Sequence, residues 1–227
     1  MARIKADIQV VNRKGLYYTV ARDKRVKRYR PWLGDHLSFL YDWTMSSSVF
    51  PRKFGADMQK HYDILTRALA GFHGARVLEL AAGSGSAVHF LGSDSRYTGT
   101  DISPGLLKRA ARRFREAGFS DAEFYVVSAD DLPFEDASFD LCLCILSLNF
   151  IGNVEQVFQE AGRVLLPGGT FVCSVPVPER NRLQSTIRGT LYSEAALADV
   201  SRAQGFEFEP LPHENGALLY FSATKRG

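Results

Sequence analysis

The sequence lacks several features that would indicate a membrane or secreted protein. No apolar run approaches the roughly 20 residues of a membrane-spanning helix, and the opening segment MARIKADIQVVNRKG lacks the apolar core of a secretory signal. Cysteine occurs only three times, at positions 142, 144 and 173, and never as a CxxC pair. Neither a disulfide framework nor a cysteine zinc site is therefore indicated, and we expect a cytoplasmic protein without a metal, whose cysteines are small core residues.

Positive charge is concentrated rather than spread over the chain. Residues 22–30, RDKRVKRYR, hold six basic residues and one acidic residue, while the whole chain has a formal net charge of only +3. A nucleic-acid-binding protein is more often basic over a broad surface, so nucleic acid is a disfavoured partner. This basic run is either a solvated helix face or arm, or a contact with an anionic substrate, a membrane surface or a partner.

From residue 76 onward, short apolar runs alternate with amphipathic helical patterns, which predicts a parallel sheet covered by helices. The predicted strands are residues 76–80, 97–100, 123–127, 139–145 and 170–175. The predicted helices are residues 57–71, 105–118, 153–169 and 193–205. Before them, residues 39–55 are rich in aromatic side chains and are expected to form a lid, and residues 6–20 could hold a short hairpin.

The last part of the chain breaks this alternation. Two further strands, 205–211 and 216–224, are joined only by PHEN, which is too short for a crossover helix, so they should pair antiparallel. We therefore expect an α/β fold with seven strands, the last one reversed. Residues 1–56 are expected to be an extension and lid, and residues 57–227 a single globular domain.

Residues 77–91, VLELAAGSGSAVHFL, read as a strand that enters a glycine-rich turn and then a helix. Gly83 and Gly85 permit positive φ and carry no Cβ, so a ligand can approach the backbone. A helix from Ser86 would direct its N-terminal amides at that ligand, at the edge of the sheet where α/β proteins bind ligands. Asp101, at the end of the next strand, can accept hydrogen bonds from both hydroxyls of a ribose.

Two other nucleotide-binding turns fit less well. A P-loop requires a lysine after its last glycine, and none is present here. A dinucleotide-binding turn has a third glycine where this chain has Val88, and valine would open the gap between helix and strand. From the turn alone, a purely structural role remains open.

The chain as a whole resembles the class I S-adenosylmethionine-dependent methyltransferases, specifically those that act on small molecules and lipids. The resemblance is carried by VLELAAGSG, GTDISPGLLKRA, SADDLPFEDASFD and VFQEAGRVLLPGGTFVCSV, in that order, and spans about residues 60–225. It implies a Rossmann-like, doubly wound sheet of order 3-2-1-4-5-7-6 with the last strand antiparallel. It also implies S-adenosyl-L-methionine as cofactor, S-adenosyl-L-homocysteine as product, and methyl transfer by SN2 displacement.

The resemblance also implies a set of cofactor contacts. Asp101 would hold the ribose hydroxyls and Ile102 would lie against the adenine. Ser128 stands where the family often has the aspartate that binds the adenine amino group, and the neighbouring Asp130 could compensate. The other expected contacts are Glu79, Ala81, Gly83, Gly85, Ala129 and Ile145.

The methyl acceptor is not identified by these motifs. Tyr41, His61 and Asn149 lie in segments expected to border the transferred methyl group, and each could orient an acceptor or relay a proton. Arg180, Arg182 and Arg188 follow the fifth strand and could grip a carboxylate or phosphate. All six residues could equally be ordinary structural or surface residues.

Some acceptor classes are disfavoured by missing motifs. The [ND]PP[YF] tetrapeptide of amino-methylating DNA and protein-glutamine enzymes is replaced by LSLN, and no Pro-Cys nucleophile is present. A small-molecule or lipid-like acceptor is therefore the leading prediction. An RNA or protein acceptor, or a non-catalytic adenosyl-binding module, remains the alternative.

Overall fold

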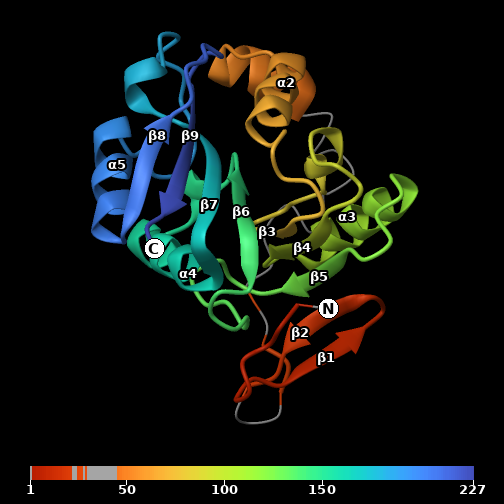
Figure 1. The fold of residues 1–227 in the computed structure, drawn as a ribbon. Coiled ribbons are helices and arrows are strands. Elements are labelled where there is room, and N and C mark those ends of the chain that lie inside the picture. Colours follow the sequence, from red (N-terminus) through yellow and green to blue (C-terminus); the bar gives the residue numbers. More distant parts are fainter. Residues whose placement is uncertain (1, 22–24, 28, 30–44) are drawn as a thin grey trace.

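The computed structural model describes residues 2–21, 25–27, 29 and 45–227. Nine strands form one sheet in the order β1-β2-β5-β4-β3-β6-β7-β9-β8 (Figure 1). The strands are β1 (Val10–Arg13), β2 (Leu16–Thr19), β3 (Arg76–Glu79), β4 (Arg96–Asp101), β5 (Glu123–Val126), β6 (Phe139–Ile145), β7 (Leu165–Pro176), β8 (Phe206–Pro210) and β9 (Leu218–Lys225). The helices are α2 (Met58–Ala68), α3 (Pro104–Glu116), α4 (Val154–Val164) and α5 (Glu194–Ala203), with a π-helical segment over Met45–Phe54.

The expectation of seven strands was wrong, because an N-terminal hairpin, β1–β2, adds two more. Its turn, Lys14–Gly15, has φ of +55° and +83°, the two positive values that a tight two-residue hairpin requires. Strand β2 pairs in parallel with β5, and the rings of Tyr17 and Tyr125 stack at 4.7 Å. The hairpin thereby covers an edge strand, which would otherwise leave unpaired backbone groups. Strands β5, β4, β3, β6 and β7 are mutually parallel, and β9 runs antiparallel to both β7 and β8.

The helices cover both faces of the sheet, because apolar side chains alternate along each strand. Val77 packs in the core under α2 and α3, and the next residue, Leu78, packs in the core under α4 and α5. The three cysteines all lie in the second core as free, buried thiols. Burial raises the pKa of Cys142 and of Cys173 well above the ordinary value, which suits core residues and not nucleophiles.

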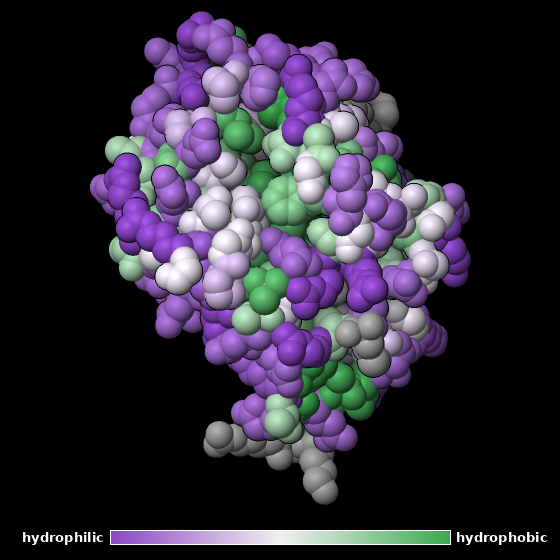
Figure 2. Space-filling model, in the orientation of Figure 1, coloured by the Kyte–Doolittle hydropathy of each residue, from purple (hydrophilic) through white to green (hydrophobic). Residues whose placement is uncertain are grey.

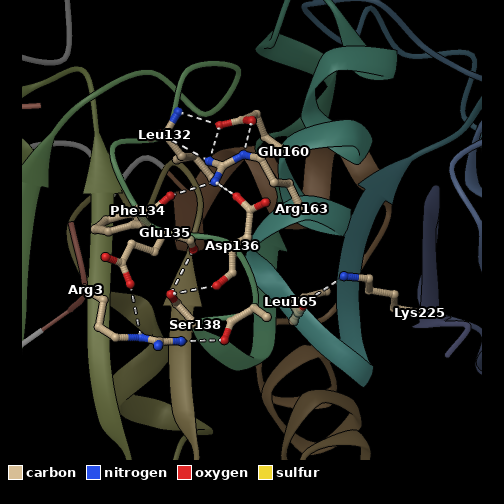
Figure 3. Close-up of polar contacts among 11 residues, drawn as sticks. Arg3, Leu132, Phe134, Glu135, Asp136, Ser138, Glu160, Arg163, Leu165 and Lys225 are labelled. Atoms are coloured by element: carbon tan, nitrogen blue, oxygen red, sulfur yellow. Dashed lines mark hydrogen bonds and ion pairs between the residues drawn. The ribbon is translucent and has the colours of Figure 1, made fainter. Parts of the chain in front are cut away.

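The loop between β5 and β6 is fixed to α4 by one arginine. Arg163 donates hydrogen bonds to the carbonyl oxygens of Phe134 (2.7 Å) and Leu132 (3.2 Å) and pairs with the carboxylates of Glu160 and Asp136 (Figure 3). Glu160 in turn accepts the N–H of Leu132 at 2.8 Å. The network holds the loop that contains the third sequence motif.

The described part of the basic run packs against this same loop and is neither a helix face nor a free arm. Lys27 donates its N–H to the carbonyl of Thr19 at 2.9 Å, and its Nζ lies 2.5 Å from the carboxylate of Asp131. The Tyr29 hydroxyl accepts the N–H of Ser128 at 3.1 Å. At least part of the run therefore has an intramolecular role.

The molecular face seen in Figure 2 is mostly hydrophilic, with apolar side chains gathered only in small groups. Among the described residues, no helix combines the length and apolar character needed to cross a bilayer.

Candidate active site

The turn after β3 has the backbone conformation that the sequence predicted. Ala81, Gly83 and Gly85 all have positive φ, at +51°, +55° and +84°. The turn is joined to β4, because the Ala82 N–H donates to the carbonyl of Thr100 at 2.8 Å. This connection places the turn at the carboxyl edge of the parallel strands, where α/β sheets bind ligands.

The helix expected after this turn is only a 3₁₀ turn over Ser86–His89. Turn-forming residues, GSDS at 92–95, follow soon afterwards, and β4 begins at Arg96, so the connection leaves no room for a longer helix. The expectation of a regular helix from Ser86 is therefore wrong, and a contact of the Ser86 segment's amides with a ligand stays a prediction.

The two glycines of the turn serve different purposes. A Cβ on Gly83 would stand in open space, with the nearest atom, the Ala81 oxygen, at 4.0 Å. A Cβ on Gly85 would lie 2.8 Å from the Cα of Ala110 in α3. Gly83 thus leaves room beside the turn, whereas Gly85 permits close packing of the turn on α3.

Asp101 links the turn to the start of α3. Its Oδ2 accepts the N–H of Gly83 at 2.9 Å and its Oδ1 accepts the N–H of Ser103 at 2.8 Å. A carboxylate oxygen can accept more than one hydrogen bond, so both oxygens can also accept hydroxyl protons of a ligand. The adjacent Ile102 side chain is 39% exposed, which is unusual for isoleucine and leaves an apolar surface next to this carboxylate.

Glu79 is a buried carboxyl at the base of the turn. It is 2% exposed, and the Tyr97 hydroxyl donates a hydrogen bond to it. Burial raises the pKa of Glu79 to about 8, the nearby Asp101 charge adds to this rise, and the hydrogen bond from Tyr97 opposes it. Glu79 is therefore largely protonated and uncharged at neutral pH.

A cavity of about 190 Å³ lies between this turn, the end of β6 and helix α2. The predicted site residues that line it are His61, Glu79, Ala81, Gly83 and Ile145. Further lining residues are Phe50, Met58, Tyr62, Ala82, Ser84, Ser86, His89, Arg113, Leu146 and Ser147. The fold thus brings candidate catalytic and candidate cofactor residues to one cavity.

The α2 side of the cavity depends on two residues that the sequence did not single out, Tyr220 and Asn215. His61 is 1% exposed, and its Nδ1 lies 2.8 Å from the Tyr220 hydroxyl. Asn215 Nδ2 lies 3.0 Å from the same hydroxyl oxygen. Burial lowers the pKa of His61 to about 3, so the ring is neutral at physiological pH. The period-two pattern of GALLYFSAT puts Tyr220 on the sheet face opposite Leu219, but no sequence signal pairs it with a residue 159 positions earlier.

The comparisons with known proteins agree with this geometry. Residues 78–173 match the methyltransferase domain family. The chain is 38% identical over 115 residues to a demethylmenaquinone methyltransferase of Clavibacter sepedonicus, a match that covers 50% of this chain and 46% of the relative. These matches support a class I S-adenosylmethionine-dependent methyltransferase domain over residues 78–173.

Two other similar proteins extend the comparison. A fatty-acid O-methyltransferase of Mycolicibacterium smegmatis is 36% identical over 110 residues, covering 47% of this chain and 39% of the relative. A solved S-adenosylmethionine-dependent methyltransferase of Mesorhizobium loti shares the fold, with a TM-score of 0.60 at 20% identity, covering 72% of this chain and 96% of that chain. The chain spans less than half the length of the two curated relatives, 46% and 39%.

In the third motif of the methyltransferase domain, the Ser128 hydroxyl donates a hydrogen bond to the Asp130 carboxylate. Ala129 is 7% exposed. Asp130 is thus already engaged by the serine that replaces the family's usual aspartate. The adenine contacts expected of these three residues stay predictions.

Among the described candidate residues, Asn149 and Arg188 do not line this cavity. Tyr41 falls outside the described residues. Asn149 is buried at 2% exposure, and its Nδ2 donates to the carbonyl of Arg188 at 2.7 Å. The backbone carbonyl of Asn149 accepts the N–H of Thr190 at 2.8 Å, so Asn149 holds the 188–190 segment in place. A direct contact of Asn149 or Arg188 with substrate stays a prediction.

Arg180 and Arg182 line a second, larger cavity of about 660 Å³, next to Lys60 and the loop before β9. Arg180 is already engaged, because it donates to the carbonyl of His213 at 3.0 Å and lies 3.4 Å from the Glu194 carboxylate. Arg182 is exposed. Substrate contacts by these arginines stay predictions. Within the described ranges, no cluster of three or more histidine, cysteine or acidic residues could hold a metal ion.

Proposed function

We propose that this protein transfers a methyl group from S-adenosylmethionine to a small-molecule or lipid-like acceptor by SN2 displacement. The observation that carries the proposal is the cavity enclosed by the glycine turn, Ile145 and His61 at the carboxyl edge of the sheet. The match to the methyltransferase domain family supports the cofactor, and the demethylmenaquinone and fatty-acid methyltransferases among the relatives support the acceptor class.

The residues of the turn fit the cofactor. Asp101 presents a fixed carboxylate for the ribose hydroxyls, and Ile102 offers an exposed apolar surface for the adenine. Gly83 leaves open space beside the backbone, where a ligand can approach. Glu79 forms part of the cavity wall next to the turn.

S-adenosylmethionine supplies a methyl group that is already activated on a sulfonium. The chain therefore has to align the acceptor and exclude water more than it has to activate either partner. The apolar and aromatic lining from Phe50, Met58 and Tyr62 suits this task. A general base is needed only where the acceptor must lose a proton, as a hydroxyl or a carbon acid must.

The first test is calorimetric binding of S-adenosylmethionine and S-adenosylhomocysteine to the wild type and to Asp101→Ala. We expect the wild type to bind both ligands. In Asp101→Ala the binding free energy should be weaker by about 2 kcal/mol, because the two expected charge-assisted hydrogen bonds to the ribose hydroxyls disappear. Asp121→Ala, on an exposed residue beyond α3, is the control.

The proposal fails if neither adenosyl ligand binds the wild type, or if NADH binds in their place. Binding of both ligands without turnover of any small or lipid-like acceptor would favour the adenosyl-binding module. A macromolecular substrate would appear as methylation of RNA or protein. A cytoplasmic location, the absence of a metal cofactor and any contact of the basic run with a membrane stay predictions.

A further inference from the structure

The hydrogen bonds behind His61 have a direction that can be read from the backbone. Asn215 Oδ1 accepts the N–H of Asp57 at 2.8 Å, and Asn215 Nδ2 donates to the carbonyl of Asp57 at 2.9 Å. A backbone N–H can only donate and a carbonyl can only accept, so the orientation of the Asn215 amide is determined. Its Nδ2 also lies 3.0 Å from the Tyr220 hydroxyl oxygen, to which it can only donate.

The Tyr220 hydroxyl therefore has to place its own proton elsewhere. Tyr220 is fully buried, and burial raises its pKa, so the hydroxyl keeps its proton. Among the described residues, the acceptor within reach is His61 Nδ1, at 2.8 Å. A buried O–H without an acceptor is strongly disfavoured, so the Tyr220 proton points to Nδ1.

This arrangement determines the tautomer of His61. Because Nδ1 accepts a hydrogen bond, the neutral imidazole carries its proton on Nε2. Within the described part of the chain, Nε2 has no hydrogen-bond partner, and the ring lines the cavity beside the glycine turn. A ligand group in that cavity that reached Nε2 would meet an N–H donor and not a lone pair.

We propose that His61 donates its Nε2–H to an oxygen of the methyl acceptor, which positions that acceptor, and that His61 is not the base of the reaction. The proposal rests on the function proposed above and adds a property of the acceptor. The acceptor carries a phenol, carbonyl or carboxylate oxygen at or near the atom that is methylated. No proton moves to or from His61, so any proton lost by the acceptor goes to another group or to solvent.

The tautomer can be measured without knowing the substrate. Long-range ¹H–¹⁵N spectra of the full chain, labelled at histidine and saturated with S-adenosylhomocysteine, distinguish Nε2–H from Nδ1–H, and the signal missing in His61→Gln assigns the residue. We expect the Nε2–H pattern from pH 5 to pH 8. A Nδ1–H pattern or an imidazolium would overturn the proposal.

Two tyrosine variants test the origin of this pattern. Tyr220→Phe removes the hydroxyl that donates to Nδ1, so both tautomers should appear. Tyr125→Phe removes another hydroxyl, which hydrogen-bonds Glu123 instead, and should leave the His61 pattern unchanged. A Tyr220→Phe spectrum identical to the wild type would show that the hydrogen bond from Tyr220 does not determine the tautomer of His61.

The donor role is tested with two probes that present an oxygen, 1,4-dihydroxynaphthalene and octanoate. In the presence of S-adenosylhomocysteine, at least one should shift the Nε2–H resonance of His61. His61→Gln keeps an N–H donor but cannot act as a base, so probe affinity should stay within about threefold, whereas His61→Leu should weaken it about tenfold to a hundredfold. Equal loss in both variants, or no shift with either probe, would overturn the donor role.

The same samples separate this proposal from the proposed function. If S-adenosylhomocysteine fails to bind the wild type by calorimetry, the methyltransferase assignment fails whatever the tautomer of His61. If it binds and His61 carries its proton on Nδ1, only the donor role fails.

Discussion

The two walls of the cavity are built in different ways. The turn wall, residues 79–86, is a continuous stretch held by Asp101 of the neighbouring strand. The helix wall joins His61 of α2 to Tyr220 of β9, 159 residues away. A local motif thus shows where a ligand binds, whereas the hydrogen-bond donor on the opposite wall exists only once the sheet has assembled.

The walls also differ in the buried titratable group that each one holds. Burial raises the pKa of Glu79 on the turn wall to about 8 and lowers the pKa of His61 on the helix wall to about 3. Both groups are therefore neutral near pH 7, for the same physical reason, because burial disfavours the charged form. The two groups should nevertheless respond to pH in opposite directions.

Glu79→Gln should remove the stability loss at high pH. The ordinary glutamate pKa is 4.5 and the folded value is about 8, so the folded state holds its proton more tightly. The free energy of unfolding of the wild type should fall as pH rises from about 4.5 to 8, by up to about 4–5 kcal/mol. Urea unfolding across this range should show the loss in the wild type and a much smaller one in the variant. Glu116→Gln, an exposed substitution, should behave as the wild type.

His61→Gln should remove the stability loss at low pH. The ordinary histidine pKa is 6.5 and the folded value is about 3, so the unfolded state binds the proton more tightly. Stability should be complete above pH 6.5 and should fall as pH drops toward 3, again by up to about 4–5 kcal/mol. His73→Gln, whose native side chain is 84% exposed, is the matched control. If the free energy of unfolding of His61→Gln fell at low pH as much as that of the wild type, protonation of His61 would not be the cause of the loss.

The two glycines of the turn wall should separate folding from binding. Gly85→Ala should lower the free energy of unfolding by about 3 kcal/mol, because its methyl group would meet the Cα of Ala110 and φ is positive. Gly83→Ala should cost only about 1 kcal/mol, for the strained backbone alone, yet weaken S-adenosylhomocysteine binding. Thermal unfolding and calorimetry measure the two effects. A Gly83→Ala variant that binds as the wild type does would remove this glycine from the ligand surface.

The same contrast explains how much the sequence could predict. Short apolar runs that alternate with helical patterns from residue 76 onward predicted the five parallel strands and the helices between them, because each pattern is local. The parallel pairing of β2 with β5 was not predictable, since a short hairpin such as β1–β2 carries no signal for the strand it joins. The segment from Ser86, predicted to be a helix, forms only one 3₁₀ turn, because β4 begins at Arg96 and the short connection leaves no room for a longer helix.

At the site, the glycine turn and Asp101 were recognised because their spacing is a property of one βαβ-like unit. His61 was recognised only as one candidate among several. Its partner Tyr220 read as an ordinary strand residue, and Asn215 as part of a polar loop. Their roles come from contacts across 158 or 159 positions of sequence, which no local pattern contains.

The smallest effect tests whether the helix wall acts as one unit. Tyr220→Phe should cost about 1 kcal/mol in the free energy of unfolding, because Asn215 keeps its two hydrogen bonds to Asp57 when the hydroxyl is lost. In a double-mutant cycle, Tyr220→Phe and His61→Gln should couple by about 0.5–1 kcal/mol, since they share one hydrogen bond. Tyr125→Phe combined with His61→Gln should be additive, because Tyr125 bonds Glu123 instead. Additivity in the first pair would mean that Tyr220 and His61 contribute to stability separately. The hydrogen bond between them would then add nothing to the free energy of unfolding.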